Sequence, residues 1–183
     1  MKLPIRKYGD PILRAKGKAI AKIDDRVRKL AASMLETMQA ANGVGLAAQQ
    51  VGQALQLTVI DISKVEDRPS TLKLDGKEMD PVSVMPLVLI NPKLNLDKET
   101  ALGLEGCLSF PDITADIERS ETVTGEAETL EGKVMKFEAG GLLARALQHE
   151  VDHLNGILFI DRMSSAAKAA VNSRLKRLKK GLI

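Results

Sequence analysis

The sequence contains one cysteine and no tryptophan in 183 residues, and its aromatic content is only 2%. A single cysteine excludes an intramolecular disulfide and therefore a secreted disulfide-stapled scaffold. So few aromatic side chains argue against a base-stacking platform for single-stranded nucleic acid. No apolar run approaches the roughly 20 residues of a membrane helix, and the first twenty residues lack the apolar segment of a signal peptide. We therefore expect a cytoplasmic protein that has neither a membrane nor specific DNA as a partner.

Charge is distributed unevenly along a chain whose composition, 44% hydrophobic and 28% charged, is that of a globular protein. Residues 162–183 contain seven lysines and arginines and no acidic residue, whereas residues 1–161 have a net charge of −4. We expect a catalytic unit over residues 1–165. Residues 166–183 are predicted to form a basic amphipathic helix that packs on this unit as part of the same domain.

Three segments have apolar residues at helical spacing. The first begins at Asp24 or Asp25, either of which can cap a helix, and ends before Asn42-Gly43. The second runs from about Glu138 to Asn155-Gly156, and the third runs through the basic tail from Ala167 to Leu182.

Strands are predicted mainly between these helices, which makes the fold class α+β. The polar segment 63–85 is expected to be a long surface excursion, with a small hairpin that turns at Asp75-Gly76. A second hairpin is expected to turn at Glu131-Gly132. Apolar, β-branched runs predict strands at 57–62, 87–92 and 157–160.

The clearest chemical pattern is His149-Glu150-Val151-Asp152-His153, which contains the only two histidines of the chain. On a helix, residues i and i+4 share one face, so the two imidazoles can bind a single metal ion. Glu150 is then placed to reach a water on the ion rather than the ion itself. The alternative is a helix with two surface histidines and no ion.

A metal ion in such a site needs a third protein ligand. After His153 the chain has no His, Glu or Cys, and its only Asp is Asp161. The strongest candidate is therefore Cys107, although an isolated cysteine is often a small buried apolar residue. A His/His/Cys set leaves the fourth position open for water, which is the arrangement of catalytic sites.

The segment Gly43-Val44-Gly45-Leu46-Ala47-Ala48-Gln49-Gln50 is rich in small residues. Its glycines allow the backbone to approach a ligand closely. It lacks the Gly-Lys-Ser/Thr and GxGxxG patterns of nucleotide sites, so composition alone favours a structural role.

Together, GVGLAAQQ, EGCLS and QHEVDH, in this order and preceded by YGDPILR, resemble the signature motifs of the peptide deformylases. The resemblance covers roughly residues 4–165. It implies the α+β deformylase fold, with antiparallel sheets around a central HExxH helix and with N-terminal and C-terminal helices. It also implies a bacterial-type hydrolase that removes the formyl group from the N-terminal methionine of nascent polypeptides.

The resemblance further assigns roles to individual residues. Cys107, His149 and His153 would bind one divalent metal ion, natively Fe(II), with zinc, nickel or cobalt as substitutes. Glu150 would be the general acid and base that activates the metal-bound water. Gln50 and the backbone N–H of Leu108 would form the oxyanion hole. The backbones of Val44, Gly45 and Gly106 would line the cleft for the formyl-methionyl peptide.

Two further expectations concern the substrate and the ribosome. Leu142 and Ala146 lie on the same helix as the histidines and are placed to line an apolar pocket for the methionine side chain, unless they only pack in the core. Arg145, between them in sequence, is expected to face solvent or an acid. The basic C-terminal helix could contact ribosomal RNA through its cations, or simply be a solvated face of a packed helix.

Three other interpretations of the site stay open at the level of sequence. In a thiol hydrolase, Cys107 would be the nucleophile and His149 the base, and chelators would have no effect. A metallopeptidase that cuts internal peptide bonds would need a third His, Glu or Asp ligand, which the chain cannot easily supply. A metal-loaded binding module would hold a fully coordinated ion without an exchangeable water.

Overall fold

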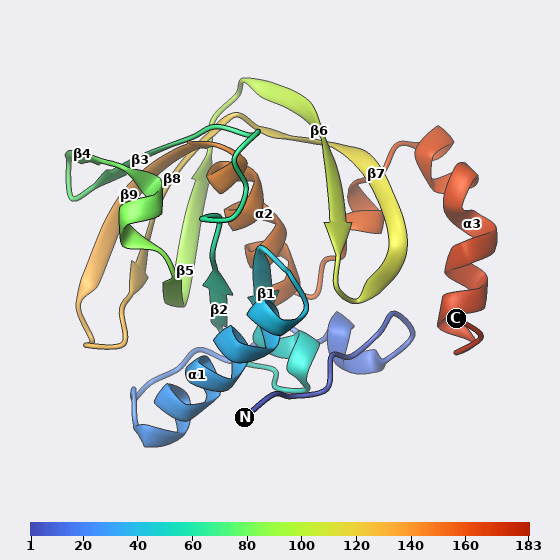
Figure 1. Cartoon of the computed structure of the whole chain (residues 1–183), viewed down its shortest axis with the longest axis horizontal. Coiled ribbons are helices and arrows are strands. Elements are labelled where there is room, and N and C mark those ends of the chain that lie inside the picture. The colour runs from blue at the N-terminus through green and yellow to red at the C-terminus, as the bar shows by residue number, and fades with distance from the viewer.

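Antiparallel pairing organises most of the chain, which the computed structural model describes from Met1 to Ile183. Seven strands form one sheet in the order β1-β2-β5-β8-β9-β3-β4, and β6 and β7 form a separate two-stranded sheet (Figure 1). The predicted α+β class is confirmed. The strand bounds are β1 Gly45–Ala47, β2 Leu57–Ile60, β3 Ser70–Leu74, β4 Lys77–Met79, β5 Leu87–Leu96, β6 Thr100–Cys107, β7 Phe110–Ser120, β8 Thr122–Glu128 and β9 Val134–Gly141.

Three α-helices accompany the sheets: α1 Asp25–Ala40, α2 Leu142–Leu154 and α3 Ser165–Lys179. The predicted start of α1 is confirmed, because the Asp24 carboxylate accepts a hydrogen bond from the backbone N–H of Val27 at 3.1 Å. The helix ends at Ala40, and Asn42 then takes the left-handed conformation with φ 55°. Short 3-10 turns lie at η1 Pro11–Arg14, η2 Ala48–Val51, η3 Pro81–Val84 and η4 Phe159–Arg162.

The central helix α2 begins at Leu142, so the predicted start near Glu138 is wrong. Glu138 belongs to β9 and pairs with Thr124 of β8 and with Lys73 of β3. Strand pairing on both sides therefore outweighs the helical spacing of the apolar residues that follow. Gly141, with φ 68°, makes the sharp change of direction from β9 into α2.

The predicted strand at 157–160 is also wrong, because this segment leads into the 3-10 turn η4. The Asp161 carboxylate accepts a hydrogen bond from the backbone N–H of Leu158 at 3.0 Å, which closes the turn locally. The apolar side chains of Leu158, Phe159 and Ile160 are buried all the same. A short apolar run thus signalled burial correctly but did not indicate the backbone conformation.

Both predicted hairpins are present. Asp75 and Gly76, with φ 48° and 83°, turn the chain from β3 into β4, and β8 pairs with β9 across the turn that contains Gly132. β3 also pairs with β9, so part of the long polar segment 63–85 extends the main sheet. Just before β3, the carbonyl of Pro69 accepts a hydrogen bond from the N–H of Leu142 at 3.0 Å, which fixes this loop to the start of α2.

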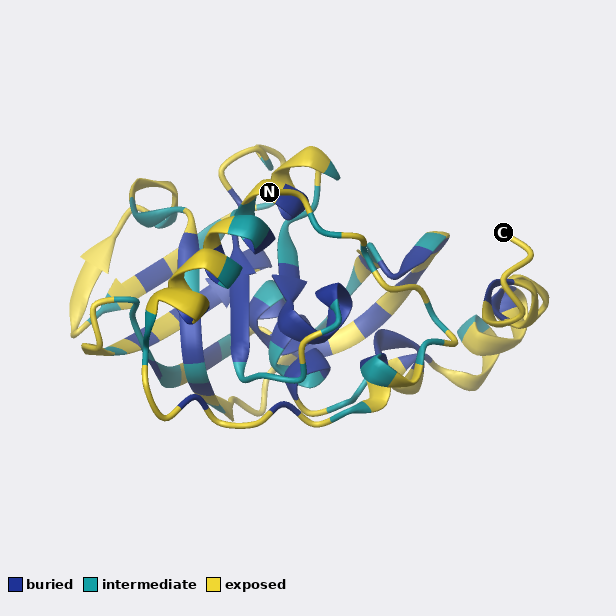
Figure 2. Cartoon of the chain, turned by 90° about the horizontal axis from the view of Figure 1, so that it is seen from below, coloured by how far each residue is buried: buried dark blue, intermediate teal, exposed yellow.

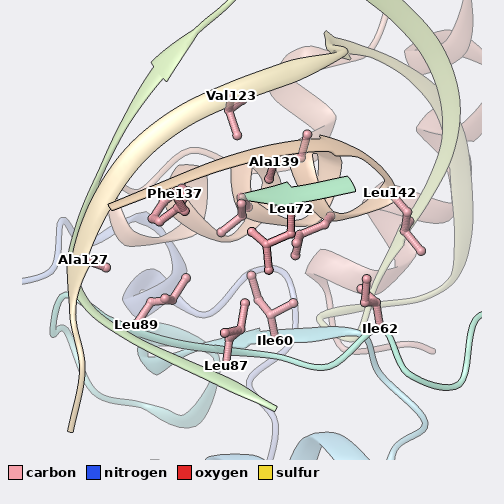
Figure 3. Packing of buried hydrophobic residues seen from close by; sticks show 13 residues of the cluster. Ile60, Ile62, Leu72, Leu87, Leu89, Val123, Ala127, Phe137, Ala139 and Leu142 are labelled. Carbon is pink, nitrogen blue, oxygen red and sulfur yellow. The ribbon is translucent and has the colours of Figure 1, made fainter. Parts of the chain in front are cut away.

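The largest core lies between the seven-stranded sheet and α2 (Figure 3). Ile60 of β2, Leu89 of β5 and Leu143 of α2 belong to this cluster, and all three have no exposed surface. Burying a side chain of this size stabilises the fold by about 1.5–3 kcal/mol relative to leaving it exposed. This packing, together with contacts of α2 to β7, holds α2 between the large sheet and the β6–β7 hairpin (Figure 1).

The C-terminal helix α3 packs on the far side of the β6–β7 hairpin (Figure 1). Val171, Leu175 and Leu178 lie on one face and are buried against a cluster that includes Ile117. The remainder of α3 is largely exposed, as is β4 at the other end of the molecule (Figure 2). None of the helices is both long and apolar enough to cross a bilayer.

Candidate functional site

Three potential metal ligands meet where the end of β6 faces α2. One ligand atom from each of Cys107, His149 and His153 lies within 4.8 Å of the others, and the Cys107 Sγ is 3.3 Å from the His153 Nε2. Ligands that bind one ion tetrahedrally, at the usual sulfur and nitrogen bond lengths, are separated by about 3.5 Å. The observed separations and the mixed thiol and imidazole donors therefore fit a single divalent ion.

Local structure explains why these three side chains converge. His149 and His153 are one turn apart on the buried face of α2 and are 8% and 1% exposed. Cys107 is the last residue of β6, and the register between β6 and β7 shifts between Gly106 and Cys107. Such an irregularity changes the direction in which a side chain at the end of a strand points. Here it directs the Cys107 thiol toward the two histidines.

Behind the histidines lies a buried network centred on Glu105, a residue that was not predicted to belong to the site. The Glu105 carboxylate accepts two hydrogen bonds from Arg119 and one from Arg145, each 2.9 Å long. It also lies 2.8 Å from the Nδ1 of His149, and this contact leaves the Nε2 of that ring free for an ion. Arg119 donates in turn to Asp152 at 2.6 Å, so the network joins β6, β7 and α2.

One signal for this network was present in the sequence. Glu105 lies two residues before Cys107, and the period-two alternation of a strand predicts both side chains on one face. The register shift after Gly106 interrupts this alternation, but Glu105 and Cys107 both contact the histidines of α2. Arg145 was expected to face solvent or an acid, and it is buried with Glu105 as its acid partner. Its guanidinium also donates to the carbonyls of Ala101 and Ile117.

The ionisable groups of the site influence one another strongly. Burial alone would raise the pKa of Glu105, but the hydrogen bonds from Arg119 and His149 outweigh it and hold this pKa well below its usual range. Burial raises the pKa of Glu150 to about 7, although the nearby His149 opposes the shift. Burial lowers the pKa of His153, and the nearby cations His149 and Arg119 act in the same direction. Burial would also lower the pKa of His149, but its contacts with Cys107 and Glu105 outweigh this effect and raise it.

Glu150 lies beside the ligand cluster without being part of it. It is 4% exposed, and its Oε2 is 3.5 Å from the hydroxyl of Thr58 on β2. The glycine at position 45 provides the space for it, because a Cβ there would lie only 2.8 Å from the Glu150 Cγ. The small residue in this segment therefore allows a carboxylate to reach the cleft.

Gln50 of η2 and Leu108, the residue after Cys107, border the ligand cluster. The Gln50 Oε1 accepts a hydrogen bond from the N–H of Ala47 at 3.0 Å, which orients the amide. Its Nε2 is then 3.1 Å from the Ser109 hydroxyl and 3.5 Å from the Cys107 Sγ. The Leu108 carbonyl accepts a hydrogen bond from Lys7 at 2.9 Å.

All the site residues predicted from sequence except His153 line one cleft of about 470 Å³. The structure thus brings together the site residues predicted from sequence, with His153 beneath the cleft. Besides Glu150, Gln50, Cys107 and His149, the cleft is lined by Val44, Gly45, Gly106, Leu108, Leu142 and Ala146.

Known proteins share both this sequence and this fold. The family model described as polypeptide deformylase matches residues 2–169. The peptide deformylase of Opitutus terrae is 45% identical over 182 residues, which is 98% of this chain and 94% of that protein. The one from Methylacidiphilum infernorum is 48% identical over 174 residues, 95% of this chain and 91% of that protein. A plant peptide deformylase crystal structure superposes with a TM-score of 0.85 at 35% identity, covering 98% of this chain and 90% of the other.

The fold and the chemical groups of the cleft are those of an α+β hydrolase. The chain belongs to the peptide deformylase family, enzymes that remove the N-formyl group from nascent polypeptides.

Proposed function

We propose that this chain removes the formyl group from N-formyl-methionyl peptides with one divalent ion held by Cys107, His149 and His153. The observation that carries the proposal is the convergence of these three ligand atoms within 4.8 Å at a cleft. Fe(II) is the proposed native ion, and zinc, nickel or cobalt would also suit thiolate and imidazole donors. When bound, such an ion polarises a carbonyl oxygen and lowers the pKa of water toward about 7.

Glu150 is the proposed general base and general acid. It takes a proton from the attacking water and later gives a proton to the departing amine, so that the formyl group leaves as formate. A pKa near neutrality suits both steps, and burial raises the pKa of Glu150 to about 7. A positioned acid–base group of this kind contributes about 10²–10⁴-fold to the rate.

Two hydrogen-bond donors are proposed to stabilise the negative charge that develops on the formyl oxygen. The Gln50 amide is held with its Nε2 3.5 Å from the Cys107 Sγ, which places a donor beside the ligand cluster. The backbone N–H of Leu108, the residue after Cys107, is the second donor. Loss of one such donor typically costs about 10²–10³-fold in kcat.

The peptide is proposed to lie along the free edge of β6. This strand pairs only with β7, so its other edge has unpaired backbone groups that can bind an extended peptide. The exposed Gly106 would bind from β6, and Val44 and Gly45 would bind from the opposite wall of the cleft. The methionine side chain would enter the part of the cleft lined by Leu142 and Ala146.

Two variants and a chelator test this proposal. Glu150→Gln should lower kcat for a formyl-methionyl peptide by at least about 10²-fold and leave the bound metal unchanged. Cys107→Ala should lose stoichiometric metal. A near-normal rate for metal-loaded Glu150→Gln would refute the acid–base role, and full metal content in Cys107→Ala would refute the ligand set. Activity that persists with chelator but is lost on alkylation would instead identify a thiol hydrolase.

We further propose that α3 contacts ribosomal RNA in the bacterial cytoplasm, where formylated chains emerge. One face of α3 packs against the body of the protein, and cations such as Lys168 and Lys176 lie on the exposed face. Binding through phosphates is salt-dependent, so replacing these lysines with glutamine should weaken ribosome binding and reduce its salt dependence. Unchanged ribosome affinity in such a variant would exclude this role.

A further inference from the structure

Arg68 is a cation on the wall of the cleft that has no acidic partner. It lies in the loop before β3, is half-buried, and lines the same cleft as Leu142 and Ala146. Its Nη1 donates a hydrogen bond to the Leu104 carbonyl at 3.1 Å, and it forms no ion pair. The loop is fixed at its base, because the carbonyl of Pro69 and the hydroxyl of Ser70 bind the first N–H groups of α2 at 3.0 and 2.9 Å.

The hydrogen bond to Leu104 shows where Arg68 lies along β6. Backbone groups of alternate residues in a strand point to the same edge. The Leu104 carbonyl accepts its hydrogen bond from Arg68, which lies outside the β6–β7 hairpin, so we take this carbonyl to point to the free edge. Gly106 lies two residues further along and has the same orientation. Arg68 therefore contacts β6 at Leu104, which lies about 7 Å from Gly106 along the same edge, in the direction away from Cys107.

Charges at the two ends of the cleft differ. At the Cys107 end, Lys7 and Asp112 both line the cleft and have opposite charges. Near Arg68, the acid in the cleft lining is Glu105, whose carboxylate is already bound by Arg119, Arg145 and His149. Arg68 therefore has no carboxylate of the cleft lining to pair with, and its exposed neighbours in the sequence, Glu66 and Asp67, lie outside that lining. Its guanidinium can bind an acid at the end toward which an extended peptide would run.

We propose that Arg68 determines substrate specificity by binding an acidic side chain at the third or fourth residue of the formyl-peptide. This inference rests on the proposed function. With the formyl group at the ligand cluster and the second residue opposite Gly106, a peptide antiparallel to β6 brings its fourth residue opposite Leu104. A carboxylate there meets the free N–H groups of a guanidinium that is already held in position by the loop.

The test measures kcat/KM for N-formyl-methionyl tetrapeptides with an amidated C-terminus, so that no terminal carboxylate competes. Glu and its isostere Gln are compared at the second, third and fourth positions. A partly exposed ion pair predicts a preference for Glu of about three- to fivefold at the third or fourth position. No preference is expected at the second position. In Arg68→Gln the Glu/Gln ratio should fall to about one.

The matched control is Lys7→Gln, which removes the cation at the opposite end of the cleft and should keep the Glu/Gln ratio. Because each ratio compares two peptides on one enzyme preparation, it does not depend on metal content or on the folded fraction. A ratio that is unchanged in Arg68→Gln, or that is lost in Lys7→Gln instead, would overturn the assignment. If no formyl-peptide is deformylated at all, the proposed function fails, which is a different result from uniform activity without a preference.

Discussion

Replacing Glu105 with glutamine should both destabilise the fold and weaken metal binding. The substitution keeps the shape of the side chain but removes the negative charge that Arg119, Arg145 and His149 share. Arg145 would keep no acidic partner, and Arg119 would keep only Asp152. Glu105 and Arg119 are 6% and 5% exposed, so water cannot replace the lost carboxylate.

The expected magnitudes follow from this burial. Removing one member of a buried charge pair costs about 3–5 kcal/mol, because the remaining charge stays buried without compensation. Loss of the group that orients a metal-binding histidine typically lowers metal affinity by about 10–100-fold. Urea denaturation of the metal-free protein measures the first effect, and competition with a chelating indicator measures the second.

Glu118→Gln is the matched control for this experiment. Glu118 is the neighbour of Arg119 on β7, but it is exposed and its carboxylate accepts a hydrogen bond from the hydroxyl of Thr100 at 2.9 Å. Its replacement should change stability by no more than about 0.5 kcal/mol. If Glu105→Gln were as stable as this control and bound metal equally well, the buried network would have no role in holding the site.

Three further predictions test other parts of the structure. Gly45→Ala should lower kcat for a formyl-methionyl peptide, because the new Cβ would lie 2.8 Å from the Glu150 Cγ and displace that carboxylate. The free energy of unfolding should change little by comparison with the activation free energy. Met34→Ala should cost about 2–5 kcal/mol in urea denaturation, because this fully buried side chain would leave a cavity. Hydrogen bonds from Arg14 and a backbone N–H outweigh burial and lower the pKa of Asp161. The stabilisation by Asp161 is therefore present above the usual pKa of about 4 and lost at lower pH, so Asp161→Asn should be destabilised by up to about 1 kcal/mol near pH 7 and not near pH 2.

The elements predicted well from sequence are those determined by local chemistry. Asp24 caps α1 through a contact three residues away, and Asp75-Gly76 forms a turn within its own hairpin. The start of α2 was misplaced because Glu138 is held in β9 by partners on β3 and β8, far away in the chain. The β6–β7 hairpin was not predicted at all, although buried Ile113, Ala115 and Ile117 alternate with polar residues along β7 as a half-buried strand requires. In β6 the pattern is misleading, because Leu102 and Leu104 lie on the exposed face and Gly103 and Glu105 lie on the buried face.

The residues of the candidate site also differ in how far the sequence predicts them. The helical spacing of His149 and His153 is visible in the sequence. The chain offers almost no ligand after His153, which made Cys107 the strongest candidate among the residues before the histidines. The roles of Gln50 and Leu108 came only from resemblance to a family, because no spacing rule links them to the histidines. The partners of Glu105 are 14 to 44 residues away in the chain and could not be paired before the fold was known.

Gly103 and Arg145 provide a test of such a non-local dependence. A Cβ at position 103 would lie 2.7 Å from the Cζ of Arg145, so Gly103→Ala should displace the guanidinium and break its hydrogen bonds to Glu105, Ile117 and Ala101. Hydrogen bonds to a charged group contribute about 1.5–3 kcal/mol each, which predicts a loss of at least about 2 kcal/mol in urea denaturation. In an Arg145→Ala background the same glycine substitution should cost less than about 0.5 kcal/mol, because nothing remains to be displaced. Equal costs in the two backgrounds would show that Gly103 is required for β6 itself and not for the arginine that crosses it.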